Sequence, residues 1–362
     1  MLKSIITLPI LFCLGLALLV GCKEDDENYE FITPTGPTRI GDSTESILQF
    51  EGRLENIRKD LNIPGMSASI VKNRQLVWAK GFGYADVNGK IPARPTTSYH
   101  LASLTKTFAA IIVMQLVEDD LLGLDNPVSN YGINIEGPGI VRVKHLLTHT
   151  SEGIPGEEYK YNGSRFSLLD NVIKIASGKT FCELLVDRIV IPLELKNTAP
   201  NVLSDDCFLS WEERIDFAWN LAQGYTSSGA IELAYPSYFG TAAGLISSVV
   251  DMATYSIAID QGMFLTEESW EQVFSPAIST NGDTLAYGLG WFVDQQQGVK
   301  ILWHYGWWDA ISALIIKVPS EETDFIIMAN NDMLSRGSNN IGIDGDVMRS
   351  VVAGEFLHTF IF

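Results

Sequence analysis

Strand-like patterns occur near both ends of this chain, whereas the residues between them have mostly helical patterns. Residues 67–71 and 75–80 form two short apolar runs joined by a tight turn at 72–74. Four more runs follow Asn281, at residues 286–293, 300–304, 311–318 and 324–328. Short apolar or alternating runs bounded by turn residues are typical of strands. We therefore predict an α/β fold, of the α+β type, in which one sheet is built from both chain ends.

Helical periodicity accounts for most of the remaining sequence. An amphipathic helix is predicted over about residues 44–61, because its apolar residues recur every three or four positions. Further helical patterns, separated by loops rich in Gly, Pro and Asn, extend from about residue 104 to 280 and predict a mostly helical lobe. Residues 346–360 predict a last helix. Catalytic groups are expected between the sheet and this lobe, where clefts commonly form.

The first 21 residues have the pattern of a targeting segment that does not belong to the fold. Lys3 supplies a positive charge, and residues 5–20 form an apolar stretch of signal-peptide length. Residues 19–22, Leu-Val-Gly-Cys, resemble the lipobox of bacterial lipoproteins, in which Cys22 would carry the lipid. An ordinary secretory signal or a short membrane anchor is the alternative. Residues 22–43 predict a tether, which leaves 44–362 as the folded domain.

The charge of the chain agrees with export. A formal net charge of -19 over 362 residues disfavours nucleic-acid binding, because phosphates attract clusters of Lys and Arg. The charged run at 23–27 resembles the signal that sends some Gram-negative lipoproteins to the cell surface, although such runs also serve as solvated tethers. We expect a lipoprotein of the outer membrane or cell surface, with the periplasm as the alternative. Its lipid anchor would be its membrane contact, and the sequence indicates no oligomeric state.

The cysteines and histidines do not predict a metal site. Within the expected domain, Cys182 and Cys207 could form one disulfide in an oxidising compartment or remain two separate thiols. The chain has no C-x-x-C or H-E-x-x-H motif. His145 and His149 lie four apart in a helical pattern, but no acidic third ligand accompanies them. We therefore expect neither a metal nor another cofactor.

A serine and a lysine three residues apart form the strongest candidate for chemistry. Ser103 and Lys106 come at the start of an apolar helical run, so both would lie on one helix face. A serine hydroxyl needs a neighbouring base, and a lysine can serve when burial lowers its pKa. The same spacing recurs at Ser69 and Lys72, but that copy lies in a predicted strand, where residues three apart point to opposite faces.

Two later segments offer partners for a Ser-Lys pair. Tyr161 precedes a predicted helix, from which a phenol could reach across a cleft. His304-Tyr305-Gly306 follows a predicted strand, where a small residue allows a substrate backbone to lie close. Taken alone, Tyr161 is typical of a surface tyrosine and His304 of a structural histidine. A Ser-Lys hydrolase needs a proton relay, oxyanion donors and a wall for its substrate, so the combination is informative.

Together these motifs resemble the serine β-lactamase-like family of penicillin-recognising enzymes, which contains class C β-lactamases, D-alanyl-D-alanine carboxypeptidases and related esterases. The resemblance runs from about residue 65 to 331. Ser103-Leu104-Thr105-Lys106 matches the S-x-x-K motif, Tyr161 the first position of Tyr-x-Asn, and His304-Tyr305-Gly306 the Lys-Thr-Gly motif in a His-x-Gly form. Similar stretches lie at 81–86, 145–151 and 287–291. The resemblance implies a β-lactamase-like fold with an antiparallel sheet and flanking helices.

The resemblance also implies a mechanism. Ser103 would attack a carbonyl while Lys106 and Tyr161 share the role of base, and water activated by Tyr161 would release the acid. His304 and Gly306 would border the substrate, and the backbone N–H groups of Ser103 and Trp307 would stabilise the oxyanion.

Two departures from the family pattern bear on the substrate. Gly163 stands where the family has Asn, which removes an amide that usually orients the lysine and the substrate carbonyl. His304 replaces a lysine, and an unperturbed histidine is mostly neutral at pH 7 and anchors a carboxylate weakly. We therefore expect a serine hydrolase acting on a small-molecule or peptide substrate, an ester, peptide or amide. A D,D-carboxypeptidase or β-lactamase proper is one alternative, and an inactive envelope-binding protein is another.

Overall fold

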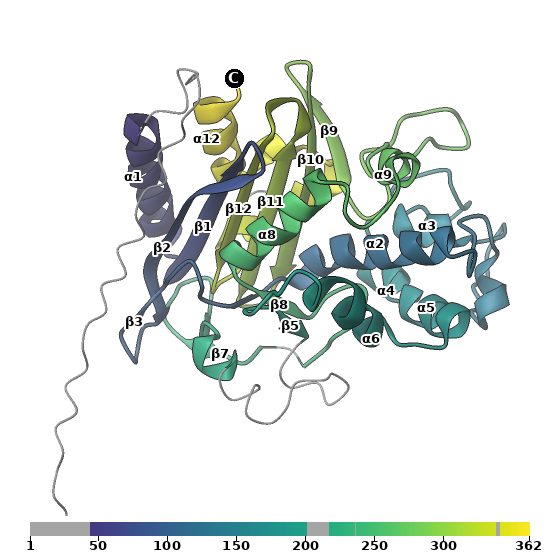
Figure 1. Cartoon of the computed structure of the whole chain (residues 1–362), viewed down its shortest axis with the longest axis horizontal. Helices are drawn as coiled ribbons and strands as arrows, with labels where there is room; N and C mark the ends of the chain where they lie inside the picture. The colour runs from purple at the N-terminus through teal and green to yellow at the C-terminus, as the bar shows by residue number, and fades with distance from the viewer. Residues whose placement is uncertain (1–43, 201–216, 236, 338–340) are drawn as a thin grey trace, which may run out of the picture. The chain divides into compact units, whose positions relative to one another are not determined.

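Seven strands form one antiparallel sheet in the order β3-β2-β1-β12-β11-β10-β9 (Figure 1). At its centre, β1 pairs with β12 from Met66 opposite Ala329 to Lys72 opposite Thr323, which joins the two ends of the domain. The predicted sheet built from both chain ends is confirmed. The strands are β1 (Gly65–Lys72), β2 (Gln75–Asp86), β3 (Ile91–Pro92), β9 (Phe292–Gln296), β10 (Val299–Trp308), β11 (Ile311–Val318) and β12 (Thr323–Ala329).

This computed structural model describes residues 44–200, 217–235, 237–337 and 341–362. The predicted targeting segment, the predicted lipidation of Cys22 and the predicted tether fall outside the described residues and stay predictions. Cys207 also lies outside the described residues. Cys182 is buried and disulfide-bonded. Among the residues described, no helix combines the length and the hydrophobicity needed to cross a bilayer.

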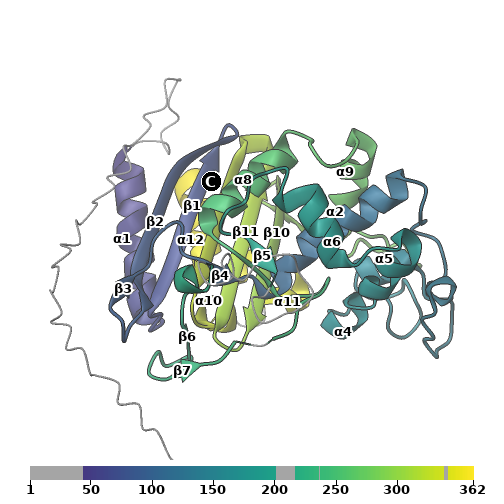
Figure 2. The same cartoon turned by 60° about the horizontal axis from the view of Figure 1, so that its bottom comes forward.

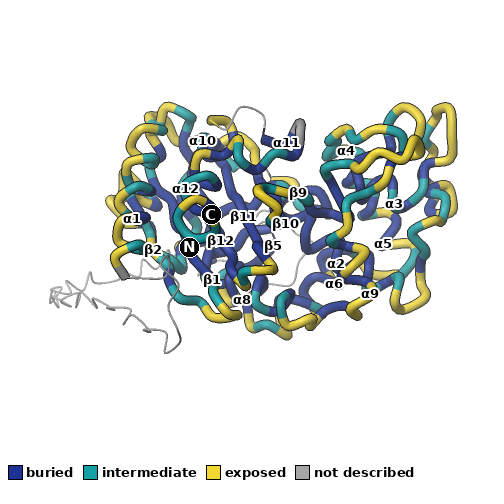
Figure 3. The backbone as a smooth tube through the Cα atoms, turned by 90° about the horizontal axis from the view of Figure 1, so that it is seen from above, coloured by how far each residue is buried: buried dark blue, intermediate teal, exposed yellow. Residues whose placement is uncertain are grey.

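Both faces of the sheet are covered, because successive residues of a strand point to opposite sides. On β12, Phe325 and Ile327 pack in one apolar cluster with α1 (Thr44–Asp60) and α12 (Val351–Phe360). Ile326 and Met328 pack on the other face with α8 (Val249–Asp260). Strands buried on both faces are rich in consecutive apolar residues, as residues 313–316 of β11 and 325–329 of β12 are. Figure 3 shows these strands as buried, with the outer turns of α1 exposed.

The helical lobe is organised around α2 (Thr105–Glu118), in which eleven of fourteen residues are buried. A helix that is apolar on all sides belongs in a core. Figure 2 shows α2 grouped with α5 and α6 beside the sheet. Among the described residues, the other helices are α3 (Val143–Leu147), α4 (Gly163–Phe166), α5 (Leu169–Ser177), α6 (Phe181–Leu185), α9 (Glu267–Val273), α10 (Met333–Arg336) and α11 (Ile341–Asp344).

Short elements connect the sheet to the lobe. Three strands, β4 (Tyr99–His100), β8 (Leu245–Ser247) and β5 (Ala199–Pro200), form a small sheet, and β6 (Gly224–Tyr225) pairs with β7 (Glu232–Leu233). Tight 3-10 turns are η1 (Ala102–Leu104), η2 (Val128–Tyr131), η4 (Pro319–Glu321) and η5 (Val347–Arg349), whereas η3 (Val186–Val190) is a wider π-helical turn that follows α6. Because β4 leads directly into η1, the small sheet fixes the start of the segment that carries Ser103.

One predicted strand was wrong in position. The run 286–293 is irregular up to Trp291, and β9 begins only at Phe292. Gly290 has a φ of +79°, which favours glycine and turns the chain. At Gly288 an added Cβ would come within 2.7 Å of the carbonyl oxygens of Val273 and Ser275. The two glycines serve a close backbone approach there, so the apolar pattern around them does not mark a strand.

Candidate active site

Ser103 and Lys106 face each other across the first turn that leads into α2. The Lys106 Nζ donates to the Ser103 Oγ over 3.0 Å. Ser103 lies in η1, directly before α2. The hydrogen bond to Lys106 shows that the two side chains are on the same side of this turn, as predicted. The second copy of the motif is split as predicted, because the Ser69 hydroxyl donates to the Val249 carbonyl while Lys72 donates to Thr323.

Lys106 occupies an environment that favours its neutral form. Its side chain is 1% exposed, and burial lowers its pKa to about 7. The Nζ also donates to the Ala242 carbonyl over 2.8 Å, and it lies 5.1 Å and 5.2 Å from the ring centroids of Tyr161 and Phe166. An amine with a pKa near 7 is neutral in about half of the molecules at neutral pH and can accept the Ser103 proton.

Tyr161 lies beside this pair, just before α4. Its buried hydroxyl forms no hydrogen bond of normal geometry with the described residues. Burial, and then the phenol of Tyr305, raise the pKa of Tyr161 well above its ordinary value, while the nearby Ser103 hydroxyl lowers it to a smaller extent. Tyr161 is therefore a neutral phenol at pH 7. Such a group can pass on a proton, but Lys106 is the better first base.

The family motif has an asparagine two residues after Tyr161, where this chain has Gly163. The neighbouring Asn162 does not take over the role of that asparagine, because its side chain has other partners. The Asn162 side chain caps α4 by accepting from the Arg165 N–H over 2.9 Å, and it donates to Glu152. At Gly163 an added Cβ would have no neighbour within 4 Å. The second partner of the Lys106 amine is instead a backbone carbonyl, that of Ala242.

Gly306 allows strand β10 to approach the nucleophile turn. A Cβ added at Gly306 would lie 2.1 Å from the Leu101 carbonyl oxygen, two residues before Ser103. β10 pairs with β9 only as far as Trp303, whereas its pairing with β11 continues to Trp308. The segment of β10 around Gly306 thus lies against the chain that leads into η1.

We expect Gly306→Ala to disrupt this approach. Its methyl group would meet rigid backbone, so β10 and η1 must separate by an ångström or more. The expected result is a loss of about 100-fold in ester turnover, because misplacement of this size costs that much, and about 1–3 kcal/mol of stability. Ester hydrolysis and urea unfolding measure the two effects. Gly52→Ala adds the same methyl to an open position of α1, so that variant should keep its activity; equal losses in both would contradict the role of the contact.

His304 lies inside the protein with both ring nitrogens occupied. Its Nδ1 donates to the Tyr305 carbonyl over 2.7 Å, because a carbonyl can only accept. Its Nε2 then accepts from the Tyr287 hydroxyl over 2.8 Å. Burial first, and then the Lys106 charge, lower the pKa of His304 to about 3. A neutral ring without a free nitrogen offers no anchor to a substrate carboxylate.

The three tryptophans around this motif have different environments. Trp303 is fully buried and stacks on Phe292 at a centroid distance of 4.1 Å. Trp307 and Trp308 are 43% and 41% exposed. Of the three, only Trp307 and Trp308 are exposed at the surface.

Some contributors to the site were not found from the sequence. Ala102 precedes the nucleophile with a φ of +46°, a left-handed conformation that costs about 1–3 kcal/mol in a non-glycine residue. The Ala242 carbonyl, which accepts from Lys106, is a backbone group, so the residue type at position 242 does not predict this contact. Tyr287 lay in a stretch noted for its family resemblance, but its contact with His304 spans seventeen residues.

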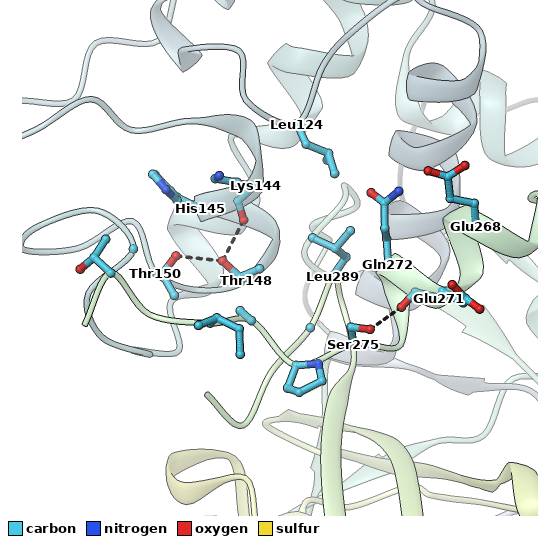
Figure 4. Close-up of a pocket in the computed structure, with 16 residues that line it drawn as sticks. Leu124, Lys144, His145, Thr148, Thr150, Glu268, Glu271, Gln272, Ser275 and Leu289 are labelled. Atoms are coloured by element: carbon cyan, nitrogen blue, oxygen red, sulfur yellow. Dashed lines mark hydrogen bonds between the residues drawn. The ribbon is translucent and has the colours of Figure 1, made fainter. Parts of the chain in front are cut away.

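A separate cavity of about 570 Å³ lies between α3, α9 and the loop at 275–289 (Figure 4). His145, Thr148 and Thr150 form one wall, and Glu268 and Gln272 lie on the other. Ser103, Lys106 and Tyr161 do not line it. In the described part of the chain, no cluster of three or more His, Cys, Asp or Glu side chains could hold a metal ion.

A protein family and several known proteins are similar to this chain. A family model described as Beta-lactamase matches residues 50–340. The chain is 24% identical over 333 residues to "Protein flp" of Staphylococcus aureus (strain MW2), a match covering 80% of this chain and 64% of that protein. It is 26% identical over 307 residues to "Penicillin-binding protein 4*" of Bacillus subtilis (strain 168), covering 71% of this chain and 66% of the relative. The chain thus spans about two thirds of the length of these relatives.

Solved structures show the same fold. A penicillin-binding protein homologue from Pyrococcus abyssi superposes with a TM-score of 0.69 at 25% identity, covering 79% of this chain and 73% of that one. A penicillin binding protein from Bacillus halodurans gives a TM-score of 0.64 at 22% identity, covering 77% and 95%. The predicted β-lactamase-like fold is confirmed.

Proposed function

This chain belongs to the beta-lactamase family, and we propose that it is a serine hydrolase that cleaves an ester, or a peptide or amide, through an acyl-enzyme on Ser103. The contact between the Lys106 amine and the Ser103 hydroxyl, 3.0 Å long, carries this proposal. The amine has a pKa of about 7, so a base is available at neutral pH. Family membership supports a serine hydrolase or penicillin-binding function in general terms.

The proposed reaction has two halves. In the first, neutral Lys106 takes the Ser103 proton as Oγ bonds to the carbonyl carbon, and the oxyanion is held by the backbone N–H groups of Ser103 and Trp307. The intermediate collapses, the bond to the leaving group breaks, and a proton passed through Tyr161 neutralises that group. In the second, water gives a proton to the same relay, attacks the ester on Ser103 and releases the acid with a free serine.

Two features narrow the choice of substrate, and one of them favours substrates without an essential carboxylate. His304 stands at the position of the family lysine, but its ring is neutral and has no free nitrogen. Gly163 supplies no amide for a substrate carbonyl. β-Lactams and D-Ala-D-Ala termini both present a carboxylate, whereas simple esters do not. Trp307 and Trp308 are exposed on opposite sides of β10, so one of them can border an apolar acyl group.

A panel of substrates tests this preference. The purified protein is assayed with p-nitrophenyl esters, nitrocefin and a D-Ala-D-Ala peptide, and intact-protein mass spectrometry follows a fluorophosphonate or a penicillin. We expect ester turnover and a fluorophosphonate adduct on Ser103, with slow or no nitrocefin cleavage. Rapid cleavage of nitrocefin without ester turnover would overturn the preference and favour the β-lactamase alternative.

Two alternatives keep specific support. The relative named "Penicillin-binding protein 4*" favours a D,D-peptidase or a β-lactam-binding protein. Gly163 and Ala310 motivate a non-catalytic, ligand-binding member of the family, and Ala310 has a φ of +63°, a conformation that favours glycine. A protein that forms no adduct with either probe would support the non-catalytic reading.

A further inference from the structure

We propose that His149 is a positioning residue that clamps residues 160–162 and thereby holds Tyr161 against the Ser103–Lys106 pair. The inference rests on the proposed function, in which Tyr161 passes protons. His145 and His149 lie four apart in a predicted helical pattern, and the sequence pattern assigns neither of them a role. The proposal gives one to His149.

Three contacts from one residue hold three consecutive residues. The His149 carbonyl accepts from the Lys160 N–H over 2.8 Å. Its Nδ1 accepts from the Asn162 N–H over 3.1 Å. Between these two hydrogen bonds, the imidazole ring packs on the Tyr161 ring at a centroid distance of 4.2 Å and an angle of 33°. The backbone on both sides of Tyr161 and its aromatic ring are therefore fixed by the same residue.

The backbone at His149 makes this arrangement possible. α3 ends at Leu147, and His149 has a φ of +54°. A left-handed conformation costs a histidine about 1–3 kcal/mol and persists only where surrounding contacts require it. Here it turns the chain out of the helical path. As a result His149 faces the Tyr161 segment, whereas His145 lines the cavity of Figure 4.

The clamp adds no charge to the site. Because Nδ1 accepts a hydrogen bond from the Asn162 N–H, the proton of the neutral ring is on Nε2. His149 is 1% exposed, and burial first, followed by the charge of Lys106, keeps its pKa well below its ordinary value. The ring is thus neutral at physiological pH. It can hold Tyr161 without competing with the single titrating amine of Lys106.

His145 is a matched control for His149. It lies four residues earlier, is also buried, and its Nδ1 likewise accepts a backbone N–H, that of Arg142, over 3.1 Å. Its loss removes a similar hydrogen bond and a similar ring from the same segment. A general destabilisation of the helical lobe would therefore affect both histidines, whereas a clamp on Tyr161 depends only on His149.

Three variants separate the two side-chain contacts of His149, which are the hydrogen bond from the Asn162 N–H to Nδ1 and the ring contact with Tyr161. His149→Asn tolerates a positive φ and keeps an acceptor near the Nδ1 position, His149→Phe keeps the ring contact, and His149→Ala loses both. We expect kcat for p-nitrophenyl ester hydrolysis to fall about 100-fold in the Ala variant and about 10-fold in Asn and Phe, since small misplacements cost this much. KM should change little, and His145→Asn should stay within about two-fold of the parent.

The crystal structure of His149→Ala gives a readout that does not depend on turnover, and we expect the Tyr161 ring to be displaced. An unmoved Tyr161, an unchanged kcat in the Ala variant, or an equal loss in His145→Asn would overturn the clamp. Failure of the proposed function is distinguishable: the parent protein would then show neither turnover nor an adduct, while a displaced Tyr161 in the variant would still support the clamp.

Discussion

Replacing Ser103 by alanine is expected to lower ester turnover by about 100,000-fold or more, because removal of a serine nucleophile abolishes the covalent route. Ser103 lies in the turn η1, and its hydroxyl accepts a hydrogen bond from Lys106. The fold should therefore tolerate the change. Turnover is measured with a p-nitrophenyl ester, and folding by thermal unfolding.

Ser69→Ala provides the control for this experiment, because Ser69 belongs to the second copy of the same motif. Its hydroxyl donates to Val249 inside the domain. We expect that variant to lose about 1 kcal/mol of stability and to keep its turnover and its fluorophosphonate adduct. An equal adduct in the parent and in Ser103→Ala would refute the assignment of the nucleophile.

Lys106→Met should reduce turnover by about 1,000-fold or more, because it removes the general base while keeping an unbranched side chain of similar length. In the parent protein the neutral amine is the active form. The logarithm of kcat/KM should therefore rise by about one per pH unit below pH 7 and become level above it, as the pKa of about 7 requires. The methionine variant should lack this titration. Lys72→Met, from the second copy of the motif, should keep it.

The same variant should also change how stability depends on pH. The pKa of Lys106 is about 7 in the folded protein, against an ordinary value of 10.5. Between these values the unfolded chain binds more protons than the folded protein, so the free energy of unfolding rises with pH. The parent should gain about 2 kcal/mol relative to Lys106→Met between pH 7 and pH 9. Urea unfolding at the two pH values measures this, and a constant difference would contradict a buried, titrating lysine.

Local geometry explains which parts of the site were predictable from the sequence. Residues three apart on a helix lie on one face, so the Ser103–Lys106 contact followed from spacing alone. The same reasoning rejected Ser69 and Lys72, because a strand sends residues three apart to opposite sides. The pairing of the two chain ends in one sheet was likewise predictable, since isolated strand patterns must find partners.

Other features of the site depend on residues that are distant in the sequence. His304 was expected beside the substrate, but whether its ring has a free nitrogen depends on Tyr287 and on the depth of the strand in the core. His145 and His149 were expected on one helix, but a single positive φ at His149 directs them to different places. Burial lowers the pKa of Lys106, and its amine lies near the rings of Tyr161 and Phe166, which come from the segment that leads into α4 and from α4 itself.

The sequence by itself determined the fold, the family resemblance and the pair Ser103–Lys106, because these depend on periodicity and spacing within single elements. Only the tertiary structure decided that Gly306 lets β10 contact the Leu101 carbonyl, that the Ala242 carbonyl holds the lysine, and that His149 brackets Tyr161. The physical reason is that these contacts use backbone groups or close approaches between separate elements. Backbone groups are present at every residue, so only their arrangement in space distinguishes them.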